Sequence, residues 1–549
     1  MNDAAQAWWR RPWAAATLLA AVLVLAAVLR LKGIAWGLPY SFVNADESTV
    51  VPIAARVARG HVDPGFFYYP SFYFYLLAAV TLLATPVLWL VKHADPLTMR
   101  AFVLDPGPYF LLGRLLSAAC GVAAVYFIYR IGRAAFGRPA GLVAALLLAV
   151  APLAVTYSHM AVTDMTATAL ALLAVWLLLE AAQGRGRRWL LGGAVAAGLA
   201  TSTKYNLGAL ALPATVAAVY ACREEVARRA AAGARAARLW ARLLVLRVYV
   251  PMGLAFFAGS PFVVLDVRRF AGDFLRQNEI VSRGWLGFEN VGNGFWYNLH
   301  TNLGGGIGVV LVVLGIAGVA WALWRHTRLD LMVAPYVVLY YLYVSTWKEL
   351  ADRYLLPVAP LVILFAVRFC LELAGLRPAW RRVALPVVVV VLAVAFALPL
   401  ASAVSFDRGL SGTDTRAVGK AWIERTIPDG TVIAMENYSP QLVVSEDRPY
   451  FTAAGLAQPA YRIVRIPVPL PRGGDQGLSV PGLQHEGVRY VVLSSAVDDR
   501  VRAAASTYPA RMAFYRDLER TGKLVKEFRP GPGERGPVLR IYRLPPTPR

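Results

Sequence analysis

The sequence has 549 residues, of which 58% are hydrophobic and only 16% are charged. Such a composition excludes an ordinary soluble protein, because apolar windows of about 20 residues, each long enough to cross a bilayer, recur from residue 13 to residue 402. The net charge of +23 does not indicate nucleic-acid binding, since the arginines lie in short loops between apolar segments, where they set membrane orientation and contact anionic lipids.

The sequence therefore predicts a polytopic α-helical membrane protein, in which each spanning helix satisfies its own backbone hydrogen bonds. The first apolar segment is longer than the core of a signal peptide, and no convincing cleavage site follows it, so we expect it to be retained. About eleven spans are expected, and they lie near residues 13–31, 109–129, 140–157, 165–182, 190–203, 206–221, 243–262, 304–324, 330–347, 354–372 and 383–402.

One further apolar segment, residues 70–91, is also long enough to cross the membrane. If it does not cross, nearly all arginine clusters of the loops, from Arg10 to Arg382, fall on one side of the membrane. The positive-inside rule favours this arrangement, in which 70–91 is a juxtamembrane or re-entrant segment of a first external loop at 32–108. The alternative is a true twelfth span. The favoured arrangement places the amino terminus in the cytoplasm and the carboxyl terminus outside a plasma (inner) membrane.

The last part of the chain, residues 403–549, differs in composition from the apolar region 1–402. DTRAVGKAWIERTIPDGTVIAMEN predicts an amphipathic helix, a Pro-Asp-Gly turn and a strand. VRYVVLSSA, KLVKEF and PVLRIYRL predict further strands around a helix near 505–521. We expect residues 1–402 to form a transmembrane domain and residues 403–549 to form an extracytoplasmic α/β domain with its own core.

Ionisable residues collect on the external face of this arrangement. The stretch NADESTVV carries Asp46 and Glu47 just after the first span, and Asp164 lies at the start of a later one. The basic residues of the same face are Lys204, Lys348 and Arg353. Because charges at mid-depth in a bilayer cost about 2.5–3.5 kcal/mol each, their grouping indicates a polar ligand. Carboxylates suit the removal of a proton from a hydroxyl group, and Lys and Arg suit the binding of a phosphate.

Each of these residues also has a purely structural interpretation. Asp46 would be a good cap for a helix beginning at Glu47, and Asp164 would be a surface charge at the start of its span. The three basic residues would anchor the helix ends at the interface. The loop 263–303 contains the aromatic run GWLGFENVGNGFWYNLH, which forms either an interfacial belt or a sugar-binding surface. The candidate substrate-binding residues of this run are Trp285, Glu289, Trp296 and Tyr297.

Several motifs together resemble the bacterial GT-C glycosyltransferases of the protein O-mannosyltransferase and aminoarabinose (lipid A) transferase type. They are the acidic pair, YYPSFYFYLL, GRLLSAACGVAAVYFIYRIGRAAFG, HMAVTDMTATALALL and DRYLLPVAP, in this order within residues 10–405. Family members are integral membrane enzymes that use polyprenyl-phosphate sugars. One departure is Tyr69, which stands where the family commonly has a histidine. This departure, and the absence of the repeats that follow the membrane domain in eukaryotic O-mannosyltransferases, argue against a protein acceptor.

The resemblance implies roles for individual residues. Asp46 would be the general base, Glu47 would orient this base or bind the sugar, and Asp164 would be a second active-site carboxylate. Arg114 and Arg353 would contact the donor phosphate, with Lys204 as a less specific member of the same group. We add Lys348 to these candidate residues for binding the donor phosphate, and Tyr69 to the candidate substrate-binding residues.

We therefore predict a membrane glycosyltransferase that moves a sugar from a polyprenyl phosphate to a hydroxyl acceptor, with inversion at the anomeric carbon. The expected partners are the donor, a glycan, lipid or protein acceptor, and membrane lipids, but not nucleic acid. No cofactor is required, and participation of a divalent metal is left open, because a lipid-phosphate donor does not need a metal in order to leave. Cys120, Cys222 and Cys370 lack metal-ligand spacing and therefore indicate no zinc site. The alternative functions are a transporter or flippase of a lipid-linked or anionic substrate, and a scaffold without catalytic activity.

Overall fold

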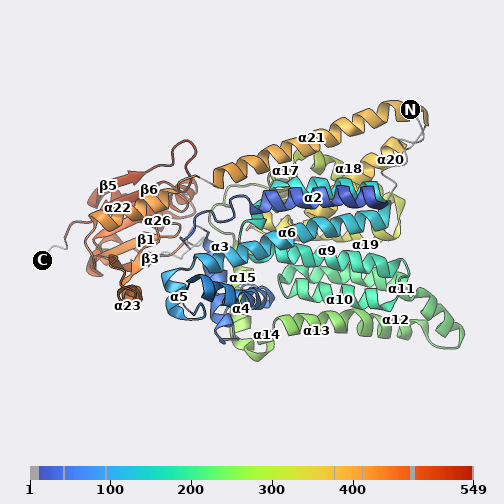
Figure 1. The fold of residues 1–549 in the computed structure, drawn as a ribbon, viewed down its shortest axis with the longest axis horizontal. Helices are drawn as coiled ribbons and strands as arrows, with labels where there is room; N and C mark the ends of the chain where they lie inside the picture. Colours follow the sequence, from blue (N-terminus) through green and yellow to red (C-terminus); the bar gives the residue numbers. More distant parts are fainter. Residues whose placement is uncertain are drawn as a thin grey trace.

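The computed structural model describes residues 12–40, 44–92, 95–375, 378–410, 412–469 and 477–546. These residues form a long helical bundle with an α/β domain at one end (Figure 1). The bundle helices are α2 (Pro12–Leu31), α6 (Gly107–Phe136), α7 (Arg138–Val150), α8 (Pro152–Ser158), α9 (Thr163–Ala182), α10 (Arg187–Thr201), α11 (Ala211–Ala231), α12 (Ala236–Leu244), α13 (Val250–Gly259), α18 (Val309–Arg325), α19 (Arg328–Ser345), α20 (Ala359–Gly375) and α21 (Pro378–Leu410).

Seven helical segments of the described residues are long and apolar enough to cross a membrane, or up to nine if each of two bent pairs forms one span. The pair α7–α8 bends by 59°, and the predicted span 304–324 is broken at Gly308 by a bend of 116°. Gly308 has a φ of 93°, a conformation that residues with a Cβ rarely adopt, so α18 begins only after it. The predicted spans near 190–203, 330–347 and 354–372 are the helices α10, α19 and α20, with 15, 18 and 17 residues.

The segment 70–91 forms one unbroken helix, α4 (Phe72–Lys92), which by length and composition alone could cross a membrane. In Figure 1, however, α4 is seen nearly end-on beside α3 (Ala45–Ala58), whereas the long bundle helices lie across the view. The first half of α4 packs against α3 and α6, and its second half exposes apolar side chains, including Leu83 and Leu90. This placement favours the juxtamembrane interpretation.

Arg10, Arg11 and Arg377, which contributed to the charge argument, lie outside the described residues, as do the side chains of Arg381 and Arg382.

The α/β domain follows α21 directly and contains a six-stranded sheet of order β2-β3-β1-β4-β6-β5. The strands are β1 (Val432–Glu436), β2 (Val443–Val444), β3 (Ala460–Ile466), β4 (Tyr490–Ser494), β5 (Lys523–Phe528) and β6 (Leu539–Arg543). The first four are parallel, and β6 and β5 are antiparallel additions at one edge. The sequence predicted β1, β4, β5, β6 and the helix α26 (Pro509–Thr521), whereas β2 and β3 were not predicted.

A buried carboxyl group lies where the parallel strands end. Glu436, the last residue of β1, has no exposed surface and accepts hydrogen bonds from Tyr515 Oη at 2.5 Å, Arg511 Nη1 at 3.3 Å and the amide of Ser494 at 3.0 Å. Burial raises the pKa of Glu436 to about 7, because removal from water disfavours its charged form more than these donors favour it.

This shift predicts that Glu436 makes the protein less stable as the pH rises. The folded chain keeps the proton of Glu436 at pH values where the unfolded chain has lost it, so the free energy of unfolding should fall between about pH 4.5 and pH 7, by on the order of 3 kcal/mol. The measurement is thermal unfolding of the full-length protein at pH 5 and pH 8. Glu436→Gln should flatten this dependence, and Glu424→Gln, on a glutamate paired with Lys420, is the matched control. Equal slopes for the wild type and Glu436→Gln would contradict the prediction.

Candidate active site

Asp46 lies in the first turn of α3. This helix lies near the end of the bundle that faces the α/β domain (Figure 1). The cap of this helix is Asn44, whose side-chain oxygen accepts hydrogen bonds from the amides of Asp46 at 2.9 Å and Glu47 at 3.3 Å. The interpretation of Asp46 as the helix cap is therefore wrong. The carboxylate of Asp46 is 36% exposed, which leaves it accessible for chemistry.

Arg353 forms an ion pair with Asp46 through Nη1. It belongs to the 3-10 helix η5 (Asp352–Leu355), in the loop between α19 and α20, and its Nη2 lies 3.4 Å from Glu349 Oε1. The neighbouring Asp352 accepts a hydrogen bond of 2.6 Å from the hydroxyl of Tyr157 on α8. Segments that are far apart in the sequence thus meet around one arginine.

Asp164 and Lys204 form a second ion pair, which is almost fully buried. Asp164 lies in the first turn of α9, and Lys204 precedes the 3-10 helix η2 (Tyr205–Leu210). The ammonium group of Lys204 is 5.2 Å from the centroid of the Tyr354 ring, and the guanidinium of Arg353 is 5.7 Å from the same centroid. Tyr354 therefore connects the two ion pairs into one site.

Glu47 and Arg114 form a third pair, which has no access to solvent. Arg114 Nε and Nη2 each donate a hydrogen bond of 2.8 Å to Glu47, and Nη1 donates to the carbonyl oxygens of Ile34 at 3.0 Å and Trp36 at 2.6 Å. Glu47 also accepts from the amide of Ala161 at 2.7 Å. Because both groups are enclosed and satisfied within the chain, the structure favours a positioning role for them over the predicted phosphate contact of Arg114. Of the two roles predicted for Glu47, orientation of the base therefore fits better than binding of the sugar.

Trp36 joins this buried pair to the α/β domain. The centroid of its indole ring lies 4.7 Å from the guanidinium of Arg114 and 5.4 Å from that of Arg535, which belongs to the loop between β5 and β6. The indole N–H donates to the carbonyl oxygen of His159 at 3.1 Å. Neither Trp36 nor Arg535 could be predicted from the sequence, since no local pattern shows that they meet.

Tyr438, two residues after the end of β1, is a second contribution of the α/β domain. Its φ of 62° is unusual for a residue with a bulky side chain and is typical of functional or strained positions. Burial raises the pKa of Tyr438, and the negative charge of Asp46 raises it further, so its phenol lies within electrostatic reach of that carboxylate.

A small aromatic cavity of about 190 Å³, here called the inner cavity, adjoins the ion pairs. Its lining includes Tyr68, Tyr69, Lys204, Phe274, Trp347 and Tyr354. Burial raises the pKa of Tyr69, and the negative charge of Asp46 raises it further, which keeps the phenol protonated as a hydrogen-bond donor. The structure thus brings Tyr69 and Lys204 into one aromatic cavity, and Arg353 lies beside it, next to the ring of Tyr354.

A larger cleft of about 1120 Å³, here called the outer cleft, lies between the bundle and the α/β domain. Its lining includes Trp285, Glu289, Trp347, Lys348, Ser506 and Thr507. Lys348, predicted to bind the donor phosphate, lines this cleft and not the inner cavity. The two other predicted aromatic residues do not line it: Trp296 is 65% exposed and stacks on His300, and Tyr297 follows it in the short helix α16 (Gly294–Tyr297).

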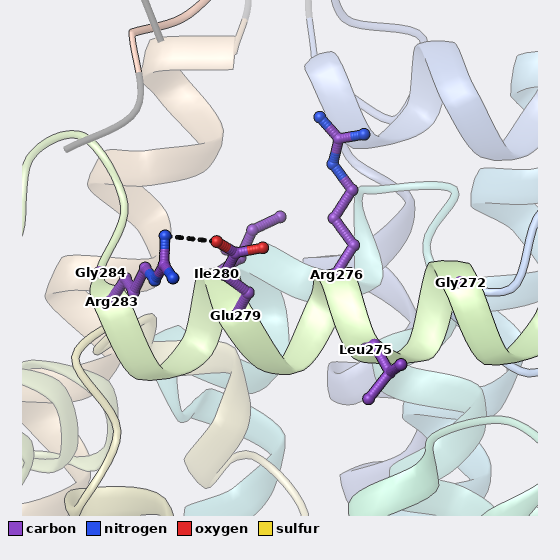
Figure 2. A pocket seen from close by; sticks show the side chains of 7 residues that line it. All are labelled: Gly272, Leu275, Arg276, Glu279, Ile280, Arg283 and Gly284. Atoms are coloured by element: carbon purple, nitrogen blue, oxygen red, sulfur yellow. Dashed lines mark ion pairs between the residues drawn. The ribbon is translucent and has the colours of Figure 1, made fainter. Parts of the chain in front are cut away.

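The helix α15 (Val267–Arg283) borders the inner cavity with one face, which carries Phe274 and Val281. Figure 2 shows its outer face, where Leu275 and Arg276 point to opposite sides of the helix and Arg283 pairs with Glu279 at 2.5 Å. A shallow cavity of about 420 Å³ on this face is lined by residues of α15 and Gly284 alone, so it does not reach the ion pairs around Asp46.

Within the described residues, no group of three or more His, Cys, Asp or Glu side chains is placed to hold a metal ion.

Comparison with known proteins agrees with this architecture. Residues 110–254 match the sequence profile of the family described as dolichyl-phosphate-mannose-protein mannosyltransferase. The structure of ArnT from Cupriavidus metallidurans bound to undecaprenyl phosphate superposes with a TM-score of 0.53 and 17% identity, covering 97% of this chain and 98% of ArnT. The archaeal oligosaccharyltransferase AglB from Archaeoglobus fulgidus, in complex with an inhibitory peptide and a dolichol phosphate, gives a TM-score of 0.52 and 12% identity, with 96% of this chain and 74% of AglB covered.

A search of curated protein sequences finds no match. The likeness to ArnT and AglB shows the fold of the chain, and the resemblance to GT-C glycosyltransferases inferred from the sequence is confirmed.

Proposed function

We propose that the chain is a membrane glycosyltransferase that transfers one sugar from a polyprenyl phosphate to a hydroxyl group of an acceptor. The observation that carries this proposal is the accessible carboxylate of Asp46, held by Arg353 beside a cavity that contains Lys204. We place the site on the extracytoplasmic side of the plasma (inner) membrane, together with the α/β domain. The match to a mannosyltransferase family and the fold shared with proteins whose structures contain undecaprenyl or dolichol phosphate support the donor class.

In the proposed reaction the donor phosphate binds near Arg353 and Lys204, and the sugar ring packs against the aromatic side chains of the inner cavity. Arg353 is the partner of Asp46, so an incoming phosphate competes for its guanidinium and releases the carboxylate. Asp46 then removes the proton of the acceptor hydroxyl group. The acceptor oxygen attacks C1 of the sugar, the bond between C1 and the phosphate oxygen breaks, and the polyprenyl phosphate leaves as an anion.

This chemistry needs only one carboxylate as a base. The leaving phosphate is already a stable anion, so no general acid is required, unlike the two carboxylates of glycoside hydrolysis. The single displacement inverts the anomeric carbon. The cations around the leaving group stabilise its charge, which is commonly at least as large a contribution to the rate as the base.

A transporter or flippase is the main competing function. The carboxylates of the three ion pairs lie in the first turns of α3 and α9, at helix ends, whereas the substrate sites of transporters lie near the middle of the bilayer. The transferase therefore accounts better for the position of the charges.

The experiment that tests the function compares the lipid-linked sugars of cells with and without the chain by mass spectrometry. Without the chain, one polyprenyl-phosphate sugar should accumulate, because its consumer is missing, and the wild-type chain should return it to its original level. The mass of the head group would identify the sugar. An unchanged lipid profile, with the acceptor also unmodified in the wild type, would show that the proposed donor class is wrong.

A further inference from the structure

We infer that His159 is a positioning residue of the transferase. As an imidazolium ion it fixes the segment 32–36, between α2 and α3, and through this segment it sets the position of Asp46. The inference rests on the transfer reaction proposed above and adds a residue and a pH dependence that the proposed chemistry does not include. Three observations carry it: the contacts of the imidazole ring, a buried carboxylate beside the ring, and a continuous path of hydrogen bonds to α3.

Both ring nitrogens of His159 lie against carbonyl oxygens. Nδ1 is 2.9 Å from the carbonyl oxygen of Val155, in α8, and Nε2 is 2.9 Å from that of Lys32, just after α2. A carbonyl oxygen only accepts hydrogen bonds, and a neutral imidazole has a single N–H group to donate. The imidazolium ion, which carries a proton on each nitrogen, satisfies both contacts, whereas the neutral ring would turn one lone pair toward an oxygen.

A buried carboxylate supplies the counter-charge for this ion. Asp407 of α21 has no exposed surface, and its Oδ1 lies 3.8 Å from Nε2 of His159. Neither carboxylate oxygen of Asp407 has a hydrogen-bond partner within the described residues. A buried carboxylate without a partner is strongly destabilising, so a cation is needed beside it. The imidazolium form of His159 meets this need.

Three further cations approach from the neighbouring elements, and none of them forms an ion pair with Asp407 in the part of the chain that the structure describes. Arg30 of α2 is buried, but its Nη atoms donate to carbonyl oxygens of α2 and α7. The side chain of Lys32 is exposed. Arg535 of the α/β domain lies 5.9 Å from the ring centroid of the phenylalanine that precedes Asp407. His159 is therefore the cation that Asp407 contacts.

The segment 32–36 is held at both of its ends by His159. Its first residue accepts from the imidazole ring, and the indole N–H of its last residue, Trp36, donates to the carbonyl oxygen of His159 at 3.1 Å. Between these points Gly33, with a φ of 76°, packs so closely on the end of α21 that an added Cβ would lie 3.0 Å from Cβ of Leu410. The segment is thus enclosed between His159 and the helix that carries the counter-charge.

Hydrogen bonds lead from this segment to the base. Nη1 of Arg114, on α6, donates to two carbonyl oxygens of the segment, and the other donors of Arg114 hold Glu47. Glu47 also accepts from the amide of Ala161, two residues after His159. Because Glu47 and Asp46 share the first turn of α3, these bonds fix the base.

Loss of the proton from His159 makes one of its nitrogen–oxygen contacts repulsive and leaves Asp407 without its partner. The segment 32–36 then loosens, and the base with it. A misplacement of about 1 Å is enough to lower a rate by on the order of 100-fold. The rate of transfer should therefore depend on a proton that is not itself transferred.

The test compares the protonation of His159 with the rate of transfer from pH 5 to pH 9. Solid-state ¹⁵N NMR of the full-length protein in lipid bilayers distinguishes the imidazolium from the neutral ring, which has one nitrogen without a proton. The signal can be assigned in the wild type, because Ser158–His159 is the one place in the sequence where a serine precedes a histidine, so ¹³C-labelled serine marks it. Transfer is measured in membranes, with the lipid-linked sugar that accumulates in cells without the chain.

We expect the imidazolium signal of His159 at acid pH, and a maximal rate that falls in step with its replacement by the neutral signal, at an unchanged KM for the donor. Asp407→Asn should move both transitions to lower pH together, by about one pH unit. His159→Gln should lower the maximal rate by about 10–100-fold and abolish the fall at alkaline pH. His485→Gln, on an exposed histidine of the α/β domain, is the matched control.

Two results would overturn the inference: a neutral His159 over the whole pH range, or an imidazolium whose loss leaves the rate of transfer unchanged. A failure of the proposed function looks different, because wild-type membranes would then transfer no label at any pH while the NMR spectrum still reports the state of His159. The positioning role would fall with the reaction in that case.

Discussion

Replacing Asp46 by asparagine is expected to lower the rate of sugar transfer by about 10²–10⁴-fold, the contribution that a positioned general base typically makes. Asparagine has nearly the same shape as aspartate but cannot accept the proton of the acceptor hydroxyl group. The fold should persist, because Asn44 and not Asp46 caps α3, and the buried pair of Glu47 and Arg114 is untouched.

The measurement is the turnover of a lipid-linked sugar by purified Asp46→Asn protein, with binding of the donor followed separately. Donor binding should be unchanged or tighter, since Arg353 is released from its pair with Asp46. Asp105→Asn is the matched control: Asp105 lies in the same predicted external loop and forms an exposed ion pair with Lys92, which contributes little to stability. Transfer by Asp46→Asn at the wild-type rate would remove Asp46 from the mechanism.

The second large effect concerns stability. Arg114→Met should lower the free energy of unfolding by about 3–5 kcal/mol, because it leaves the carboxylate of Glu47 buried without a counter-ion. The carbonyl oxygens of Ile34 and Trp36 lose a donor in the same variant. We expect little folded protein in detergent at 37 °C, and size-exclusion chromatography with thermal unfolding would measure the loss.

A double variant separates the two roles that have been considered for Arg114. If the cost of Arg114→Met arises from the unpaired carboxylate, then Arg114→Met combined with Glu47→Gln should recover part of the lost stability. If Arg114 instead contacts the donor phosphate, as the sequence predicted, Arg114→Met should fold normally and show a raised KM for the donor. The second outcome would restore the original assignment.

Much of the architecture could be predicted because its signals are local. A span is an uninterrupted apolar segment, and the strand and turn patterns of the α/β domain are equally short. The placement of α4 depended instead on comparing arginines over the whole chain. The strands β2 and β3 gave no clear periodic signal, because β2 has only two residues and β3 mixes apolar residues with arginines. The break at Gly308 was missed because a glycine within an apolar segment also suits close helix packing.

The site was predicted less completely, for a physical reason. Asp46, Asp164, Lys204 and Arg353 could be found because charges beside apolar segments are costly and therefore conspicuous. Which charge pairs with which is decided by contacts between distant segments, and the partners Glu47 and Arg114 are 67 residues apart. The sequence thus identified Arg114 as important but assigned it to a phosphate rather than to a buried carboxylate. Trp36 and Tyr438 gave no signal, since aromatic residues are abundant in this chain, and Tyr354 lies within the motif DRYLLPVAP but was assigned no role.

The position of Trp36 between Arg114 and Arg535 has a consequence for biogenesis. Ribosomal synthesis releases the membrane segments first, so the bundle can insert and fold before the loop that carries Arg535 exists. The indole ring therefore receives its second cation only after synthesis has passed β5. A nascent chain that has not reached this point has the carboxylates of the external face without this contact.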